Sequence, residues 1–169
     1  MKSISRRTKL IGSTATALLA TALLAAAAVA VTSPDQTRET YVAQVEPICK
    51  KNTKANEQIL DGAEKKIKNG QLKVAAGQFS KAATAFGAAI KQIKAVPQPV
   101  ADVAKLGKWT KALEGETKLL TEISKALKAE DKGKVRNLSV QLEHNGRVAN
   151  NAVLGFDFDY CLIESSRFS

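Results

Sequence analysis

Apolar residues recur at alternating steps of three and four along most of the chain, which is the spacing of one face of an α-helix. The first such stretch begins after Asp35 or Thr37 and ends at Asn69-Gly70. Pro47 lies inside it and predicts either a kink or the first turn of a new helix. The predicted inner face of this stretch comprises Tyr41, Val45, Ile48, Asn52, Ala55 and Ile59.

The second stretch is rich in small residues. Its heptad positions are Leu72, Ala75, Phe79, Ala82, Phe86, Ala89 and Ile93. Much of the remainder is Ala or Gly, which allows neighbouring helices to approach closely, so we expect a tightly packed central helix. A surface that awaits a partner is the alternative. Two prolines, Pro97 and Pro99, end the stretch and favour a new helix start.

Two further helical stretches follow. The third has an inner face formed by Leu106, Trp109, Leu113, Glu116, Leu120, Ile123 and Leu127. The turn Glu130-Asp131-Lys132-Gly133 separates it from the fourth stretch, which ends near Gly155. The inner face of the fourth consists of Val135, Leu138, Leu142, Asn145, Ala149 and Ala152.

Four helices with short connections predict an all-α fold, an antiparallel up-down-up-down four-helix bundle. In that arrangement the end of the fourth helix lies beside the start of the first. Cys161 follows the fourth helix and Cys49 lies early in the first, so the two cysteines are expected to meet. We therefore predict one disulfide that closes the bundle. Two free thiols are the alternative.

The beginning of the chain has the pattern of a secretory signal peptide. A basic segment with Lys2 and Lys9 precedes an apolar run from Leu10 to Leu24, and Ala28-Val29-Ala30 is a small-x-small cleavage site. We expect residues 1–30 to be the leader and 31–169 to be one helical domain that is secreted or held in the cell envelope. An uncleaved membrane anchor is the alternative, because the apolar run is about long enough to span a bilayer.

The chain is rich in basic residues, with 26 Lys and Arg against 16 Asp and Glu. The whole chain has a formal charge of +10. Lys111, Lys118, Lys125 and Lys132 recur every seven residues, and this set is expected on the side of the third stretch opposite its leucines. Lys105 and Lys108 precede it and are further candidates. A solvated helix face is the ordinary meaning of such a pattern. The alternative is contact with an anionic surface such as phospholipid or wall polymer. Nucleic acid is not expected as a partner, since no recognition motif is present.

Catalytic and metal-binding patterns are missing from the sequence. His144 is the single histidine, which excludes the paired Glu-x-x-His motifs of di-iron bundles. A disulfide would use both thiols, so a zinc site lacks ligands. No G-x-S-x-G motif or phosphate-binding glycine loop occurs. Asp157 and Asp159 lie in an aromatic segment, where we expect the carboxylates to face solvent while the rings face inward. We therefore predict no enzyme activity, no cofactor and no metal.

Polar residues interrupt three of the apolar faces, at Asn52, Glu116 and Asn145. Buried polar groups at such positions often set helix register. Together they could instead line a small ligand cavity between the helices. The sequence leaves both interpretations open.

The chain resembles small exported helical-bundle proteins of high-GC Gram-positive, actinobacterial-type bacteria, whose function is not known. The segments that carry the resemblance are Tyr41-Val42-Ala43-Gln44 with Ile48-Cys49, the break at Pro97 to Pro99, and Gly155-Phe156 with Cys161. The resemblance implies a bundle with a terminal disulfide and transfers no catalytic residues.

These observations predict an exported, non-enzymatic binding or interaction module of the cell envelope or exterior, acting on an unknown protein or envelope component. Two alternatives stay open. One is lysine-mediated binding to an anionic envelope polymer or lipid, and the other is a small-ligand carrier with a cavity between the helices.

Overall fold

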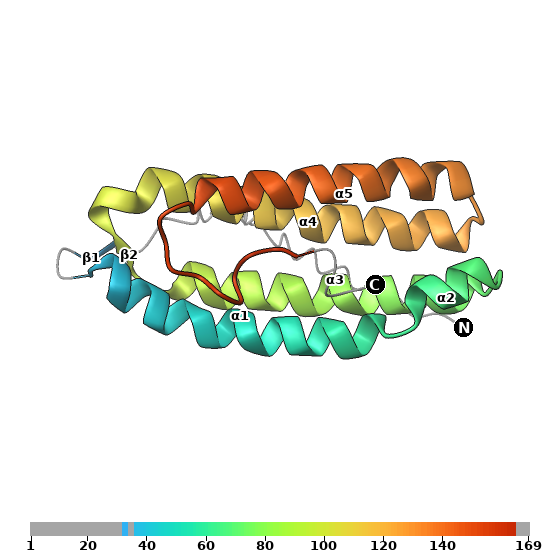
Figure 1. Ribbon diagram of the computed structural model, residues 1–169, viewed down its shortest axis with the longest axis horizontal. Coiled ribbons are helices and arrows are strands. Elements are labelled where there is room, and N and C mark those ends of the chain that lie inside the picture. The colour runs from blue at the N-terminus through green and yellow to red at the C-terminus, as the bar shows by residue number, and fades with distance from the viewer. Residues whose placement is uncertain (1–31, 34–35, 165–169) are drawn as a thin grey trace, which may run out of the picture.

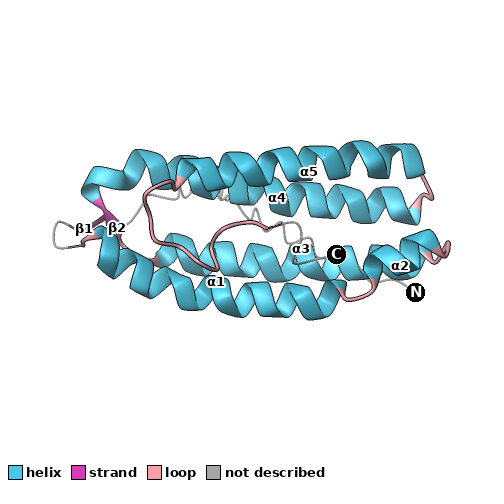
Figure 2. Cartoon of the chain, viewed as in Figure 1, coloured by secondary structure: helices cyan, strands magenta, loops and turns pink. Residues whose placement is uncertain are grey.

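A computed structural model describes residues 32–33 and 36–164 of the chain, and this part is mostly helical (Figure 1). The predicted signal peptide, residues 1–30, lies outside the described residues. The helices are α1 (Arg38–Leu60), α2 (Ala63–Lys68), α3 (Leu72–Ala95), η1 (Val100–Asp102), α4 (Val103–Lys128) and α5 (Lys132–Ala152). Two short strands, β1 (Thr32–Ser33) and β2 (Gln98–Pro99), pair in parallel at one end of the bundle (Figure 2).

The four long helices pack against one another, as predicted. The main contacts join α3 to α4, α4 to α5, and α1 to α3. By contrast, α1 and α5 make few direct contacts within the described chain. The segment after α5, residues 153–164, returns toward α1 and lies between the two helices (Figure 1). The end of the fourth helix is therefore linked to the first helix through this C-terminal segment instead of packing directly on it.

The first predicted stretch is interrupted where no break was expected. Helix α1 continues through Pro47, so this residue does not begin a new element. The helix instead ends at Leu60, and α2 begins after Gly62, whose φ of +64° is a left-handed conformation that favours glycine. The side-chain amide of Gln78 donates hydrogen bonds to the carbonyl oxygens of Ile59 and Asp61, at 2.7 and 2.9 Å. These bonds supply partners for the carbonyl groups that the end of a helix leaves free.

The buried face of α1 also differs from the predicted one beyond Val45. Ile48, Asn52, Ala55 and Ile59 are only half-buried, while the next residue along in each case is buried: Cys49, Thr53, Asn56 and Leu60. The four buried positions still alternate between steps of four and three. The disulfide at Cys49 selects this face, because its sulfur must point toward the C-terminal segment. On α4 the predicted inner face is confirmed, with Leu120 alone half-buried.

Aromatic rings fill the core at the end of the bundle where α1 and α4 begin. Trp109 of α4 stacks on Phe158, and Phe158 stacks on Phe156, with ring centroids 5.3 and 5.4 Å apart. Tyr41 of α1 meets the edge of Phe156. A second apolar cluster lies toward the other end, around Leu72, Ile123 and Leu127. The space between these two clusters holds the candidate site.

An ion pair ties three parts of the chain together at the aromatic end. The guanidinium of Arg38 donates two hydrogen bonds to the carboxylate of Asp102, at 2.7 and 3.0 Å, and a third to the carbonyl oxygen of Gly155. It also lies over the ring of Phe156. The hydrogen bonds from Arg38 lower the pKa of the buried Asp102 carboxyl. The starts of α1 and α4 and the C-terminal segment are therefore held in one arrangement.

Candidate binding cavity

A cavity of about 340 Å³ lies between the helices, next to the disulfide. Its walls come from α1, α3 and α4, with contributions from α2, α5 and the residues Tyr160 to Ile163 of the C-terminal segment. Most of the lining side chains are apolar or aromatic, among them Phe79, Phe86 and Leu113. The volume lies in the range of small-molecule binding sites, which span roughly 300–1,000 Å³.

Small residues on α3 account for much of this space. Ala82 and Ala89 are buried and line the cavity, at positions where a larger side chain would fill it. The same composition led us to expect a tightly packed central helix. Helix α3 does pack closely on α1 and α4. The separation of α1 from α5 leaves room that alanine side chains are too short to occupy.

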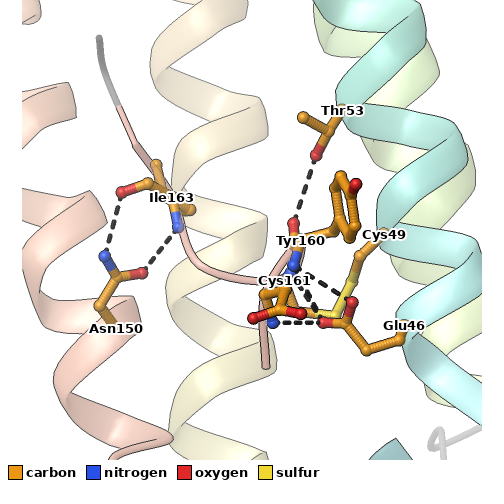
Figure 3. The surroundings of a disulfide bond; sticks show 8 residues. Glu46, Cys49, Thr53, Asn150, Tyr160, Cys161 and Ile163 are labelled. Carbon is orange, nitrogen blue, oxygen red and sulfur yellow. Dashed lines mark hydrogen bonds between the residues drawn. A yellow bond between two sulfur atoms is a disulfide. The ribbon is translucent and has the colours of Figure 1, made fainter. Parts of the chain in front are cut away.

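The C-terminal segment forms one wall of the cavity and is fixed by several interactions (Figure 3). A disulfide joins Cys49 to Cys161, as predicted. The carboxylate of Glu46 accepts hydrogen bonds from the backbone N–H groups of Asp159, Tyr160 and Cys161, at 3.0 to 3.2 Å. Nothing in the sequence pattern marked Glu46 for this role, since it lies on the half-exposed side of an amphipathic helix.

Two further side chains hold the same segment on opposite sides (Figure 3). The hydroxyl of Thr53 on α1 donates to the carbonyl oxygen of Tyr160 at 3.2 Å. On α5, the side-chain amide of Asn150 donates to the carbonyl oxygen of Ile163 at 3.0 Å and accepts from its N–H at 2.8 Å. The segment therefore bridges α1 and α5 and covers part of the space between them.

Glu116 is the most unusual residue of the cavity wall. It is 4% exposed, and its Oε1 atom has no hydrogen-bond partner in the part of the chain that the structure describes. Burial raises the pKa of this carboxyl from 4.5 to about 7, an effect that a hydrogen bond from Asn145 opposes. Gly146 of α5 makes room for the carboxyl, since a Cβ atom there would lie 3.3 Å from Oε1.

Asn56 is a second buried polar residue of the wall, and sequence reasoning missed it. It is 4% exposed, and its Oδ1 atom has no partner among the described residues. Its amide nitrogen donates to Oδ1 of Asn52 at 3.1 Å. The missed signal was its spacing from Cys49. If the disulfide turns Cys49 inward, the positions four and seven residues later, Thr53 and Asn56, must also face inward.

The structure brings the three predicted polar residues to one region. Asn52 and Glu116 line the cavity from α1 and α4. Asn145 on α5 lies behind Glu116 and donates to the backbone carbonyl oxygen of Ala112 at 2.8 Å. It thereby ties α5 to α4 and does not itself line the cavity. Indole Nε1 of Trp109, another lining residue, is a buried donor without a partner among the described atoms.

The remaining sequence candidates lie on the surface. The five predicted lysines of α4, at 105, 108, 111, 118 and 125, are all exposed. Lys125 pairs with Glu122 at 2.7 Å, and Lys105 lies 3.6 Å from Asp102. His144, Asp157 and Asp159 are exposed, while Phe156 and Phe158 are buried, as expected.

Metal sites and membrane spans are both absent from the described residues. They contain no group of three or more His, Cys, Asp and Glu side chains that could hold a metal ion. Within that same part of the chain, no helix is long and apolar enough to span a membrane.

Comparison of the chain with protein-family models, with curated proteins and with solved structures finds no match. The fold and the site still define a class of molecule. It is a helical bundle whose C-terminal segment is tied down by a disulfide and which contains a ligand-sized, mainly apolar cavity with a buried glutamate in its wall.

Proposed function

We propose that this protein is an exported, non-enzymatic binding module that holds a small, mainly apolar ligand in the cavity between its helices. One observation carries the proposal. Glu116, which lines a cavity of about 340 Å³, is 4% exposed and leaves its carboxyl Oε1 unpaired in the described structure.

The energetics of that carboxyl favour a bound partner. A buried polar atom without a hydrogen bond costs about 1–3 kcal/mol relative to a satisfied one. A leucine at position 116 would continue the apolar face of α4 without this cost. A ligand with a hydrogen-bonding group would satisfy Glu116 and recover the lost interaction.

The apolar walls would supply most of the affinity. Phe79, Phe86 and Trp109 all contribute to the lining. Burial of apolar surface contributes about 25 cal/mol per Å² removed from water, less the cost of fixing the ligand in place. A ligand with an apolar body and one polar group therefore matches the wall.

Export is supported by the leader pattern of residues 1–30 and by the Cys49–Cys161 disulfide, which suits an oxidising compartment. We also propose that the helices follow the up-down-up-down order. The short turn between α4 and α5 and the order of packed neighbours support it. The resemblance to exported actinobacterial-type bundles agrees with this location.

The proposal is tested with N-phenyl-1-naphthylamine, an apolar dye that fluoresces in apolar sites. We expect saturable binding of one dye per protein. Ala89→Leu, which fills the cavity, should abolish it. Ala88→Leu is the matched control, because the neighbouring side chain is exposed on the same helix. If Ala89→Leu does not fold, Ala82→Leu serves in its place. Equal binding by the folded cavity and control variants would refute the proposal.

A second candidate function is contact with an anionic envelope polymer or lipid. The observation in its favour is that all five predicted lysines of α4 are exposed. Such binding would weaken as salt screens the charges. Co-sedimentation with anionic vesicles or wall fragments at low and high salt tests it, and binding that persists at high salt would exclude it.

A further inference from the structure

The geometry points to a lipophilic amine as the ligand, with its protonated nitrogen at Glu116 and its apolar body against the aromatic and aliphatic wall. This inference rests on the proposed binding function and names the class of ligand. The choice of an amine follows from the charged and polar residues that line the cavity.

The charged side chains of the described cavity lining are all negative. The chain has 26 Lys and Arg residues, yet the described residues place no Lys, Arg or His side chain in the cavity lining. The charged side chains in that lining are two carboxyl groups, Glu64 and Glu116. Glu64 is exposed and pairs with Lys68, whereas Glu116 is buried. The ionised form of Glu116 would repel a carboxylate ligand, and the described lining holds no cation to offset that charge, whereas an ammonium group would meet its counter-ion.

Two residues that line the cavity each leave a buried acceptor without a hydrogen bond in the described structure. Glu116 Oε1, from α4, and Asn56 Oδ1, from α1, are both acceptors and belong to residues that line the cavity. An ammonium group offers three donors and needs no acceptor, so it can serve more than one such atom. An alcohol offers one donor.

One residue that lines the cavity instead leaves a hydrogen-bond donor unpaired among the described residues. The indole N–H of Trp109 is a buried donor without a partner in the described structure. It suits an acceptor elsewhere on the ligand, and it could also contact a carboxylate. A single neutral donor is weaker than a charge-assisted pair in a site of low dielectric. The carboxyl group of Glu116 therefore decides the preference between ligand charges.

The state of Glu116 is consistent with this role. Burial raises the pKa of its carboxyl to about 7, because the ionised form lacks solvation. A cation beside the carboxyl would supply that missing interaction and favour the ionised form. Asn145, which lies behind Glu116 on α5, would then help to fix the direction of the carboxylate.

The test is calorimetric titration with octylamine, octanol and octanoate, which share one chain and differ in the polar group. We expect the wild-type protein to bind octylamine about ten to a hundred times more tightly than octanol, and octanoate more weakly than either. Glu116→Gln should remove the advantage of the amine and leave octanol binding within about threefold. Glu114→Gln is the matched control, since it removes a carboxylate from the exposed side of the same helix.

The outcomes separate this inference from the proposed function. Equal binding of octylamine and octanol by the wild-type protein, or tightest binding of octanoate, would overturn the amine assignment while the cavity still binds ligands. If Glu116→Gln does not fold, the ranking of the three ligands in the wild-type protein decides alone. Failure of all three ligands and of N-phenyl-1-naphthylamine to bind would instead refute the cavity as a binding site.

Discussion

The carboxylate of Glu46 accepts hydrogen bonds from the backbone N–H of Tyr160, at 3.1 and 3.2 Å, across 114 residues of sequence. The same carboxylate also binds the N–H groups on either side of Tyr160. Successive N–H groups that point at one anion form a recurring binding arrangement for negative charge. Here the anion is the side chain of Glu46 on α1, three residues before Cys49. We call its hydrogen bonds to residues 159–161 the Glu46 clamp, and this clamp and the disulfide hold the same segment of the chain.

Loss of the Glu46 charge should therefore loosen the C-terminal segment. Glu46→Gln keeps the shape of the side chain but replaces charge-assisted hydrogen bonds with weaker neutral ones. We expect the free energy of unfolding to fall by about 1–2 kcal/mol, measured by urea denaturation. Glu57→Gln, at an exposed position of the same helix, is the control and should change it by less than about 0.5 kcal/mol. Equal effects of the two substitutions would show that Glu46 does not anchor the segment.

Reduction of the disulfide should lower the free energy of unfolding by more than loss of the Glu46 clamp does. The bond closes a loop with a sequence separation of 112. The unfolded chain gains conformational freedom without it, and we expect a loss of about 2–5 kcal/mol in the double variant Cys49→Ser, Cys161→Ser. Urea denaturation of oxidised, reduced and variant protein measures this. The reduced wild-type protein should match the double variant, and a reductant should leave the variant unchanged.

Stability should also depend on pH through Glu116. The pKa of this carboxyl is about 7 in the folded protein and near 4.5 when unfolded, so the unfolded state releases the proton more readily. The stabilisation is complete below about pH 4.5 and is lost as the pH rises through about 7. The full difference is about 3 kcal/mol, because each tenfold change in proton affinity corresponds to about 1.4 kcal/mol.

Glu116→Gln isolates this contribution, because every other titrating group is common to both proteins. We expect the variant to gain stability relative to the wild-type protein as the pH rises from 5 to 8. Urea denaturation across that range gives the difference at each pH. A difference that does not change with pH would mean that Glu116 ionises at its ordinary pKa in the folded protein.

Filling the cavity should stabilise the protein while it removes the ligand site. Ala89→Leu places a larger apolar side chain in the space that Ala89 lines, and we expect a gain of about 0.5–2 kcal/mol in the free energy of unfolding. Ala88→Leu, on the exposed side of α3, should have little effect. A large loss of stability in Ala89→Leu, as overpacking produces, would show that the space is smaller than the structure indicates.

Periodicity located the four long helices well because it depends on local chain geometry. The inner face of α4, from Leu106 to Leu127, follows from the spacing of its apolar residues. The break at Gly62 was missed, because one glycine inside a helical pattern is common and its left-handed conformation has no signature in the spacing. The shifted face of α1 was missed because Ile48 and Ile59 fit the apolar pattern as well as Cys49 and Leu60 do.

The spacing of apolar residues predicted only part of the candidate site. Asn52, Glu116 and Asn145 stood out as polar residues on apolar faces, and two of them line the cavity. Asn56 and Glu46 did not stand out. Glu46 acts on the C-terminal segment, which reaches it from more than a hundred residues away, and Asn56 faces inward because the disulfide turns Cys49 inward on the same helix.

By itself, the amino-acid sequence determined the helical class, the spacing of the core residues and the pairing of the two cysteines, since these follow from helix periodicity and from the cysteine count. The tertiary structure alone decided that α1 and α5 stand apart, that the C-terminal segment lies between them, and that a cavity forms around Glu116. The physical reason is that a cavity is the volume that several elements together fail to fill, and no single stretch of sequence encodes it.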